Sequence, residues 1–361
     1  MSRGGIESFM MNYYRYFDKE KIQVDFIVHG FEKGVYDDEI TNMGGRIYNV
    51  PVKSKDYFGN VNALNKIFSS GKYKIVHSHM DAMSMVVLKQ AKKCGISIRI
   101  AHSHNTQHLT NNRIKYLLNE YARKNVSRYA THYVACSEPA ARWLFGNENV
   151  DDNKVIYIKN AIDLDKYKFD NLTRENIRRE YDLKNEFVIG HVGRFDYQKN
   201  HFFLLDIFKD ILKVQPNARL FLIGDGHLRN KIETKILELN IKDKVILAGI
   251  KDDVDRIMNA FDVFCLPSHF EGLGIVLVEA QTNGLMCITS NEVPREVNIS
   301  GETQFISLNA PIEKWVNSLL DVKENINRNI NYDYFINAGY SIVNESQRLE
   351  NIYLKLSGVK A

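Results

Sequence analysis

The sequence predicts an α/β protein with two domains, each built on a parallel sheet. Short apolar runs alternate with helical patterns along almost the whole chain, and this alternation is typical of parallel α/β sheets. At 361 residues the chain is long for a single hydrophobic core, so two domains are expected. The polar, weakly patterned stretch 163–186 separates two series of apolar runs and is interpreted as the hinge.

Each apolar run is expected to form one buried strand. The first series comprises Ile22–Val28, Arg46–Val50, Lys74–His77, Ile96–Ala101, His132–Cys136 and Val155–Ile158. The second series comprises Phe187–Val192, Arg219–Ile223, Val245–Leu247, Val263–Leu266 and Cys287–Ser290. We therefore expect one domain at 1–163, a second at 164–331, and a final helix from Tyr332 to Leu356.

Composition narrows the class of protein. Hydrophobic residues make up 44% and charged residues 25%, as in ordinary soluble proteins. No apolar run approaches the ~20 residues of a membrane-spanning helix, and no signal peptide is recognisable. The cysteines Cys94, Cys136, Cys265 and Cys287 are far apart and form no C-x-x-C pair. We expect reduced thiols and a cytoplasmic location.

The charge is unevenly distributed along the chain. Residues 1–163 hold 23 Lys or Arg and 16 Asp or Glu, a net charge of +7, whereas the remainder has a net charge of −3. The first half is therefore expected to meet something anionic. Because no nucleic-acid module is recognisable, we expect no nucleic-acid partner. A phospholipid surface or a lipid-pyrophosphate acceptor fits better.

The most informative string spans residues 270–280 and places Glu271 and Glu279 eight residues apart. Glu271 lies beside two glycines and belongs to a loop, and Leu273–Asn283 is predicted to be a helix. If helical throughout, the string separates the carboxylates by about 12 Å, more than the ~5–9.5 Å of hydrolytic glycosidase pairs. The spacing suits the two ends of one long ligand held at a helix N-terminus, which favours anions.

This string resembles the E-x7-E signature of the retaining glycosyltransferases of family 4, which have the GT-B fold. Pro267-Ser268 before it and Gly284-Leu285 after it add to the resemblance, which covers the chain from Gly4 to about Val297. It implies two Rossmann-like domains facing a central cleft. The first would bind the acceptor, the second would bind a nucleotide sugar, and the segment 332–361 would cross back to the first. The alternative is a surface loop and a helix with two unrelated glutamates.

The resemblance also assigns roles to individual residues. Glu279 would bind ribose hydroxyls, and Glu271 would bind the donor sugar. The backbone that would assist Glu271 belongs to Gly272, Leu273, Gly274 and Ile275.

Arg194 and Lys199 follow Gly193 at the expected carboxyl end of a strand, where open α/β sheets bind ligands. Two fixed cations there would stabilise a leaving diphosphate without a metal ion, so we expect no cofactor. The alternative is a pair of solvated loop cations.

Gly224 and Gly226 form a tight turn between a strand and a helix. A dinucleotide fingerprint needs a third glycine at position 229, which is Arg229, so that interpretation fails. The resemblance places this turn beside the nucleotide, where the two glycines would provide room for the backbone.

Five histidines resemble a metal cluster at first sight: His77, His79, His102, His104 and His108. In each His-Ser-His pair we expect the two rings to point to opposite faces of the strand. No cysteine or closely spaced carboxylate completes a site, so no metal is expected. The resemblance implies that His102 faces the donor sugar, where a neutral imidazole can hydrogen-bond a hydroxyl or the leaving oxygen. His79 is a weaker candidate, and a loop histidine without a role remains the alternative.

Gly4 and Gly5 precede a helix whose apolar face is marked by Ile6, Phe9 and Tyr13. A glycine turn of this kind normally follows a strand, and in the resembled family that turn lies at the donor. The sequence is therefore expected to be shortened at its start by roughly ten residues.

The segment Asn112–Arg128 combines basic and apolar residues: Arg113, Lys115, Arg123, Lys124 and Arg128 with Ile114, Leu117, Leu118, Tyr121 and Val126. It is expected either to lie on the inner face of an anionic membrane or to pack on the sheet with solvated cations.

We conclude from the sequence that the chain transfers a hexosyl unit, with retention, from a UDP-sugar to a saccharide or polyprenyl-pyrophosphate-linked acceptor in exopolysaccharide or capsule synthesis. The strings 3–9 and 100–105 resemble bacterial enzymes of that kind. The alternatives are a nucleotide-sugar epimerase of the same fold and a non-catalytic nucleotide-sugar-binding subunit.

Overall fold

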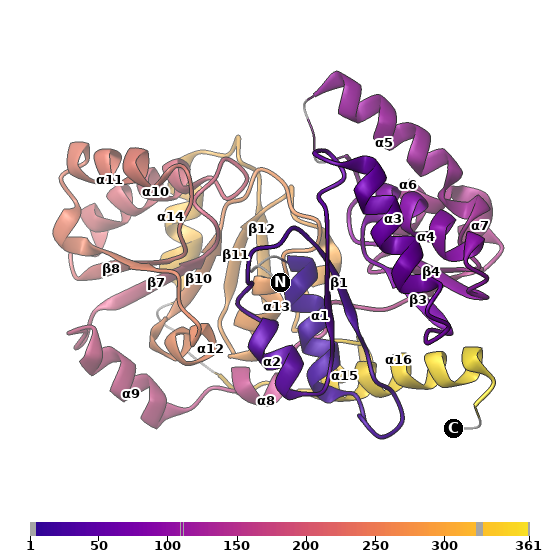
Figure 1. The fold of residues 1–361 in the computed structure, drawn as a ribbon. Coiled ribbons are helices and arrows are strands. Elements are labelled where there is room, and N and C mark those ends of the chain that lie inside the picture. The colour runs from indigo at the N-terminus through magenta and orange to yellow at the C-terminus, as the bar shows by residue number, and fades with distance from the viewer. Residues whose placement is uncertain (1–4, 109, 111, 323–327, 360–361) are drawn as a thin grey trace. The chain divides into compact units, whose positions relative to one another are not determined.

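The computed structural model describes residues 5–108, 110, 112–322 and 328–359. The chain divides into two compact units, Met1–Ile162 with Ser341–Ala361, and Asp163–Tyr340 (Figure 1). The unit that begins at Asp163 will be called the second unit, and the other the first unit.

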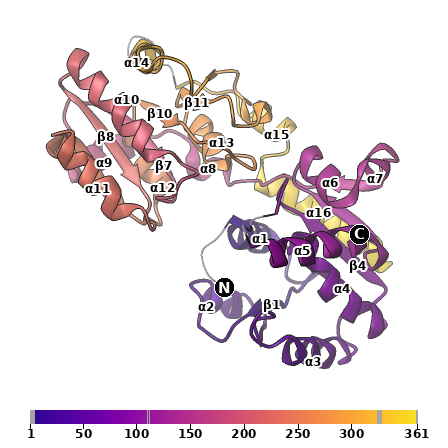
Figure 2. The same cartoon turned by 90° about the horizontal axis from the view of Figure 1, so that it is seen from above.

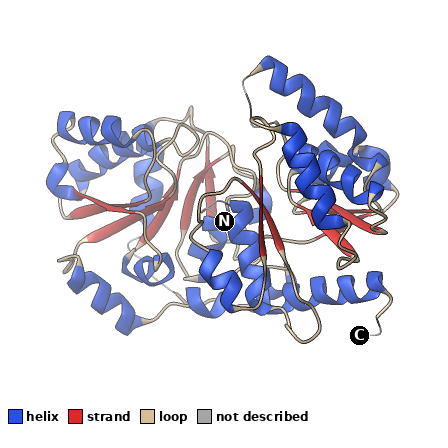
Figure 3. Ribbon diagram, in the orientation of Figure 1, coloured by secondary structure: helices blue, strands red, loops and turns tan. Residues whose placement is uncertain are grey.

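The second unit is built on a six-stranded sheet in the order β12-β11-β10-β7-β8-β9, and its neighbouring strands pair in parallel (Figure 3). Its strands are β7 (Phe187–Val192), β8 (Ala218–Ile223), β9 (Val245–Gly249), β10 (Val263–Leu266), β11 (Cys287–Ser290) and β12 (Thr303–Ile306). Its helices are α8 (Leu164–Tyr167), α9 (Asn171–Glu180), α10 (His201–Val214), α11 (Arg229–Glu238), α12 (Val254–Ile257), α13 (Ile275–Thr282), α14 (Ile312–Asp321) and α15 (Asp333–Asn337). Val192 pairs with Ile223, so the loops after β7 and β8 leave the sheet at the same edge.

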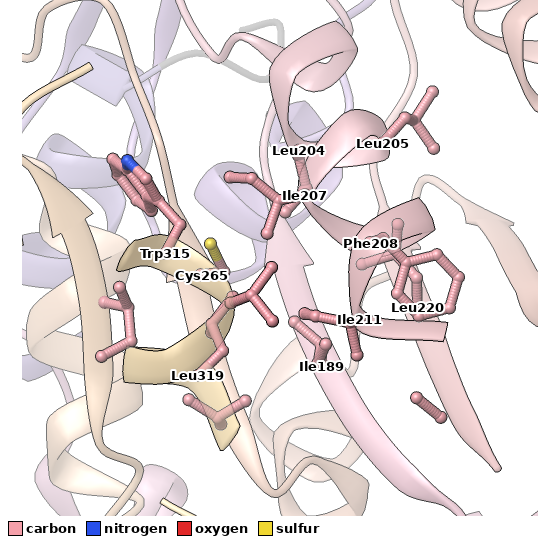
Figure 4. Packing of buried hydrophobic residues seen from close by; sticks show 14 of the residues in the cluster. Ile189, Leu204, Leu205, Ile207, Phe208, Ile211, Leu220, Cys265, Trp315 and Leu319 are labelled. Carbon is pink, nitrogen blue, oxygen red and sulfur yellow. The ribbon is translucent and has the colours of Figure 1, made fainter. Parts of the chain in front are cut away.

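The core of the second unit packs α10 and α14 against the sheet (Figure 4). Leu204, Phe208 and Ile211 recur at the spacing of one helix face, and each is at most 1% exposed. Burying each such side chain contributes roughly 1.5–3 kcal/mol to the free energy of unfolding. This packing holds the strands in place, and with them the edge from which the loops after β7 and β8 emerge.

The stretch 163–186, expected to be a hinge, is instead a structured part of the second unit. It contains α8 and α9, and Arg174 on α9 donates to the carboxylate of Asp262 at 2.5 Å. Arg178 donates to the backbone carbonyl of Ala260 at 2.9 Å. Its polar composition therefore reflects ion pairs and hydrogen bonds that hold it to the second unit.

The first unit distributes its strands between two parallel sheets. One contains β1 (Phe26–His29) and β2 (Ile47–Val50), and the other has the order β3-β4-β5-β6. The latter strands are β3 (Ile75–Ser78), β4 (Ile98–Ser103), β5 (His132–Ala135) and β6 (Val155–Tyr157). Every residue of β1 and of β3 lines a cavity of about 1520 Å³. Thus β1 and β3 are each paired on one side only within the described strands.

The helices of the first unit are α1 (Gly5–Tyr16), α2 (Asp37–Asn42), α3 (Tyr57–Phe68), α4 (Ser84–Lys93), α5 (Arg113–Asn125), α6 (Glu138–Phe145), α7 (Asn147–Asp151) and α16 (Ile342–Ser357). α1 lies beside α16 (Figure 2). The expectation that the sequence is shortened at its start by roughly ten residues, which would carry a further strand, stays a prediction. Gly4 itself lies outside the described residues.

The final helix expected from Tyr332 to Leu356 is two helices. α15 ends at Asn337, Gly339 has a φ of +80°, and α16 begins at Ile342. A left-handed residue terminates a helix, so the chain changes direction there. α15 belongs to the second unit and α16 to the first.

Candidate functional site

In the second unit the loops after β7 and β8 pack backbone against backbone. A Cβ atom on Gly224 would lie 2.0 Å from the carbonyl oxygen of Gly193, and one on Gly226 would lie 2.4 Å from that of Phe195. The N–H of Phe195 donates to the carbonyl of Asp225 at 3.0 Å. Both glycines are therefore required by the close approach of the two loops. Their expected place beside the nucleotide stays a prediction.

Glu271 is the most densely bonded carboxylate of this region. Lys199 Nζ donates to Glu271 Oε1 at 2.6 Å, and Ser268 Oγ donates to the same oxygen at 2.6 Å. Gln198 Nε2 donates to Oε2 at 3.0 Å. The Glu271 side chain is 6% exposed and that of Lys199 15%. Three donors from two loops thus hold the carboxylate in one orientation.

Arg194 and Lys199 occupy the same loop but differ in their surroundings. Arg194 is exposed, and no side-chain hydrogen bond or ion pair of its guanidinium occurs within the described residues. Lys199 is mostly buried against Glu271, and a Cβ on Gly193 would lie 2.9 Å from Lys199 Cγ. The loop therefore offers one open cation and one that is already oriented.

The loop that carries Glu271 ends at the N-terminus of α13. Gly274 has a φ of +83°, and the helix begins at Ile275, two residues later than the sequence predicted. The left-handed residue delays the start of the helix. The N–H groups of the first turn of a helix have no acceptor within it, and Gly272 just before them is exposed. This end of α13 can receive an anion or a sugar oxygen.

Glu279 lies within α13 and is partly buried. Burial raises its pKa from an ordinary 4.5 to about 7, while a hydrogen bond with Tyr167 and the charge of Lys199 act in the opposite direction. Tyr167 ends α8, and burial together with Glu279 raises the pKa of its hydroxyl. The sequence pattern did not indicate Tyr167, because it lies in the stretch interpreted as a hinge.

In the first unit, the expectation that the paired histidines face opposite ways is wrong. The rings of His77 and His79 stack with centroids 4.2 Å apart, and those of His102 and His104 with centroids 4.0 Å apart. Residues two apart on a strand lie on the same face, which the prediction had reversed. β3 and β4 are neighbours, so all four rings gather in one cluster.

His102 is fully buried, and its two ring nitrogens differ. Nδ1 lies 3.1 Å from His77 Nε2, whereas Nε2 has no hydrogen-bond partner. Burial and the neighbouring rings keep the pKa of His102 well below its usual value, so the ring is neutral. Of the glycines expected at the donor, Gly4 lies outside the described residues. Gly5 is the first residue of α1, and a Cβ added to it would meet no atom within 4 Å.

The helix α5 exposes its apolar face. Ile114, Leu117, Leu118 and Tyr121 are 60–71% exposed, and Ala122 is the buried residue of this helix. These four side chains do not pack in the core of the first unit, whereas Val126 of the same segment is buried. Two of the expected cations are engaged with Glu120, since Arg123 donates to it at 2.7 Å and Lys124 Nζ lies 3.8 Å from its carboxylate. No helix in the described part of the chain has the length and apolar character needed to cross a bilayer.

Two family profiles match the chain, "Glycosyltransferase Family 4" over residues 3–166 and "Glycosyl transferases group 1" over residues 173–341. EpsF of Bacillus subtilis (strain 168), a protein assigned to the glycosyltransferases, is 35% identical over 327 residues, which cover 88% of this chain and 84% of EpsF. A UDP-Gal:alpha-D-GlcNAc-diphosphoundecaprenol alpha-1,3-galactosyltransferase of Escherichia coli is 28% identical over 309 residues, covering 81% of this chain and 78% of that enzyme.

Solved structures share the fold at low sequence identity. A glycosyltransferase from Rickettsia africae ESF-5 has a TM-score of 0.75 and 18% identity, covering 99% of this chain and 96% of that one. HepE of Anabaena, solved with UDP-glucose, has a TM-score of 0.72 and 16% identity, covering 99% and 94%.

Proposed function

This chain belongs to glycosyltransferase family 4 and has the GT-B fold, and from this we propose that it transfers a hexosyl unit from a UDP-sugar to a lipid-linked saccharide. The activity of the Escherichia coli relative, which uses UDP-Gal and a diphosphoundecaprenol acceptor, supports the donor and acceptor classes. The relatives also include CapH of Staphylococcus aureus, a capsular polysaccharide biosynthesis glycosyltransferase, 24% identical over 98% of this chain and 96% of CapH.

The observation that carries the proposal is the orientation of Glu271 by Lys199, Ser268 and Gln198. We assign the donor sugar to Glu271 and to the backbone from Gly272 to Ile275, at the N-terminus of α13. An ammonium group has three donors, and one of those on Lys199 is used by Glu271. The others remain for a phosphate oxygen, and the exposed Arg194 would bind the same diphosphate.

We assign the ribose to Glu279. A carboxylate can accept two hydrogen bonds from vicinal hydroxyls, and Tyr167 helps to orient it. With a pKa of about 7, the Glu279 carboxyl is partly protonated near neutral pH. Hydrogen bonds from the ribose hydroxyls would favour its charged form, so donor binding would release the proton.

Transfer would proceed with retention by attack on the front face of the sugar. The acceptor oxygen forms its bond to C1 as the bond between C1 and the phosphate oxygen breaks, and the acceptor proton passes to that phosphate oxygen. UDP leaves with the electron pair of the broken bond. Lys199, Arg194 and the N–H groups of α13 would stabilise the developing charge, so no metal ion is needed at the diphosphate. A neutral His102 would hydrogen-bond the sugar or the leaving oxygen.

The first unit would bind the acceptor and contact the inner face of the cell membrane through α5. The exposed face of Ile114, Leu117, Leu118 and Tyr121 supplies the apolar contact. Arg113, Lys115 and Arg128 lie on the same segment and supply the charge, whereas Arg123 and Lys124 are paired with Glu120. At about 1 kcal/mol for each basic residue near an anionic surface, the attachment would be loose and reversible.

A donor screen tests the proposal. Thermal shift and slow donor hydrolysis are measured against UDP-, GDP- and ADP-linked hexoses, and we expect a UDP-sugar to give the largest responses in both. Stabilisation by GDP- or ADP-sugars alone would contradict the UDP assignment. Conversion of the donor to an epimer without an acceptor would instead identify an epimerase, and binding without any turnover would identify a binding subunit.

A further inference from the structure

Two His-x-His segments lie side by side in the first unit. His77 lies in β3 and His79 directly follows it, while His102 lies in the adjacent strand β4 and His104 directly follows that strand. Alternate residues of neighbouring parallel strands face the same side, so the backbone brings the four imidazoles together. Two imidazoles from one strand and a third from its neighbour are an arrangement suited to a transition-metal ion.

The nitrogen atoms lie within reach of one ion. One ring nitrogen from each of His77, His79 and His102 lies within 4.8 Å of the other two. His77 Nε2 and His102 Nδ1 are 3.1 Å apart. Tetrahedral zinc with bonds of about 2.0–2.1 Å to nitrogen requires separations of about 3.3 Å, so small ring movements suffice.

The surroundings orient the rings as ligands. Tyr353 of α16 has its hydroxyl 2.5 Å from His77 Nδ1, so Nδ1 is engaged and Nε2 faces His102. Such a contact to the non-ligating nitrogen commonly fixes a metal-binding histidine. His102 is completely buried and Phe9 packs edge-on against it with centroids 5.1 Å apart. The cavity beside β3 is lined by both His77 and His79 and provides a route of entry.

We propose that His77, His79 and His102 bind one divalent transition-metal ion of the zinc class. The ion would take the place of the single proton between His77 Nε2 and His102 Nδ1, and that proton would move to the other nitrogen of its own ring, so that both rings bind as neutral imidazoles. His104, whose Nε2 lies 2.9 Å from His79 Nδ1, orients the third ligand. This site is formed wholly by the first unit. It shares only His102 with the residues assigned to the donor, and it uses Nδ1 of that ring rather than Nε2, which has no hydrogen-bond partner, so it does not depend on the donor assignment.

The test is direct binding of the metal alone to the full chain after removal of metals. Zn²⁺ binding is measured by calorimetry and Co²⁺ binding by visible absorption. We expect one ion per chain with a Kd of about 1 µM or below, and an intense Co²⁺ band typical of a tetrahedral site. His79→Ala should weaken binding at least about 100-fold, because one of three ligands is lost. His227→Ala, an exposed histidine of the second unit, is the matched control and should bind like the wild type.

A second variant distinguishes weaker metal binding from misfolding of the chain. Tyr353→Phe keeps the ring and removes only the hydroxyl that contacts His77, and we expect roughly 10- to 100-fold weaker binding with an unchanged fold. Zn²⁺ binding weaker than about 0.1 mM in the wild type would overturn the proposal. So would tight binding that neither His79→Ala nor Tyr353→Phe weakens.

Discussion

The two units place their polar groups in different settings, although both are parallel α/β structures. In the second unit one six-stranded sheet carries closely packed loops at a single edge, and Glu271 is held there by three donors. In the first unit the strands are split between two sheets, and a cavity of about 1520 Å³ borders β1, β3 and the histidine pair His77 and His79. In the second unit the continuous sheet thus holds the polar side chains in place without a ligand. In the first unit the divided sheets leave a cavity beside the histidines.

The largest expected contrast is in stability. Phe208→Ala should cost about 3–5 kcal/mol in the second unit, because Phe208 is fully buried and leaves a cavity. Ile27→Ala should cost less than about 2 kcal/mol in the first, because Ile27 is only partly buried and already borders the cavity.

The measurement is urea unfolding followed by tryptophan fluorescence. Trp143 lies in the first unit and Trp315 in the second, so single-tryptophan backgrounds report each unit separately. Equal losses of stability at the two positions would show that the first unit is packed as tightly as the second.

The next contrast concerns the oriented and the open cation. Lys199→Ala should slow turnover roughly 10²–10³-fold, the scale for losing one preorganised electrostatic contact. Arg194→Ala should have a smaller effect, because its exposed side chain must still be ordered by the ligand. Steady-state kinetics with the donor identified by the screen decide this, and a larger loss at Arg194 would reverse the assignment.

Donor affinity should separate the two glutamates. Two charge-assisted hydrogen bonds to ribose hydroxyls contribute ~1.5–3 kcal/mol, so Glu279→Ala should weaken donor binding about 10- to 150-fold. Glu271→Ala should weaken it less, because Glu271 is assigned to the sugar. Calorimetry with Glu238→Ala, a glutamate at the end of α11, provides the control. Near-wild-type affinity in both variants would refute the role of this motif.

The pH dependence of stability should reveal the burial of Glu279. Its folded pKa of about 7 exceeds its ordinary value of 4.5, so the folded state retains the proton longer than the unfolded state. The free energy of unfolding therefore falls as the pH rises from about 4.5 to 7. Glu279→Gln stays neutral, and we expect its fall over this window to be smaller by on the order of 2 kcal/mol. The measurement is the free energy of unfolding of both proteins from denaturant titrations between about pH 4.5 and 8. If it changes with pH to the same extent in both, the pKa of Glu279 is not raised.

The smallest expected effect is that of a chelator. Transfer should continue in excess EDTA, because Arg194 and Lys199 supply the charge at the diphosphate. The experiment is best repeated in His79→Ala, which removes the proposed histidine metal site. Activity abolished by EDTA in that variant and restored by Mn²⁺ would place a metal at the diphosphate.

Much of the fold follows from short-range patterns in the sequence. Phe187–Val192, Val263–Leu266 and Cys287–Ser290 are predicted with the bounds that the structure has, because buried parallel strands are continuous apolar runs. β12 escapes prediction, because Thr303 and Gln304 make it polar and it lies at the sheet edge. The helix break at Gly339 escapes it too, because the apolar pattern continues on both sides.

The site is harder to predict where it depends on contacts distant in sequence. The string from Glu271 to Glu279 indicates both carboxylates, but nothing in it indicates that Lys199 and Gln198 hold Glu271. Tyr167 has no local signal at all, since its role comes only from the packing of α8 against α13. Four of the five histidines that stand out in the sequence do gather, but the prediction had the direction of their rings wrong. His108 lies apart from them, against Glu120 and Trp143.

The most direct test of the central claim is a crystal structure of the protein with bound UDP. We predict that the diphosphate contacts Lys199 and Arg194, that the ribose hydroxyls contact Glu279, and that the terminal phosphate points to the N-terminus of α13. UDP bound to the second unit without contact to Glu279 or Lys199, or bound only to the first unit, would contradict the account.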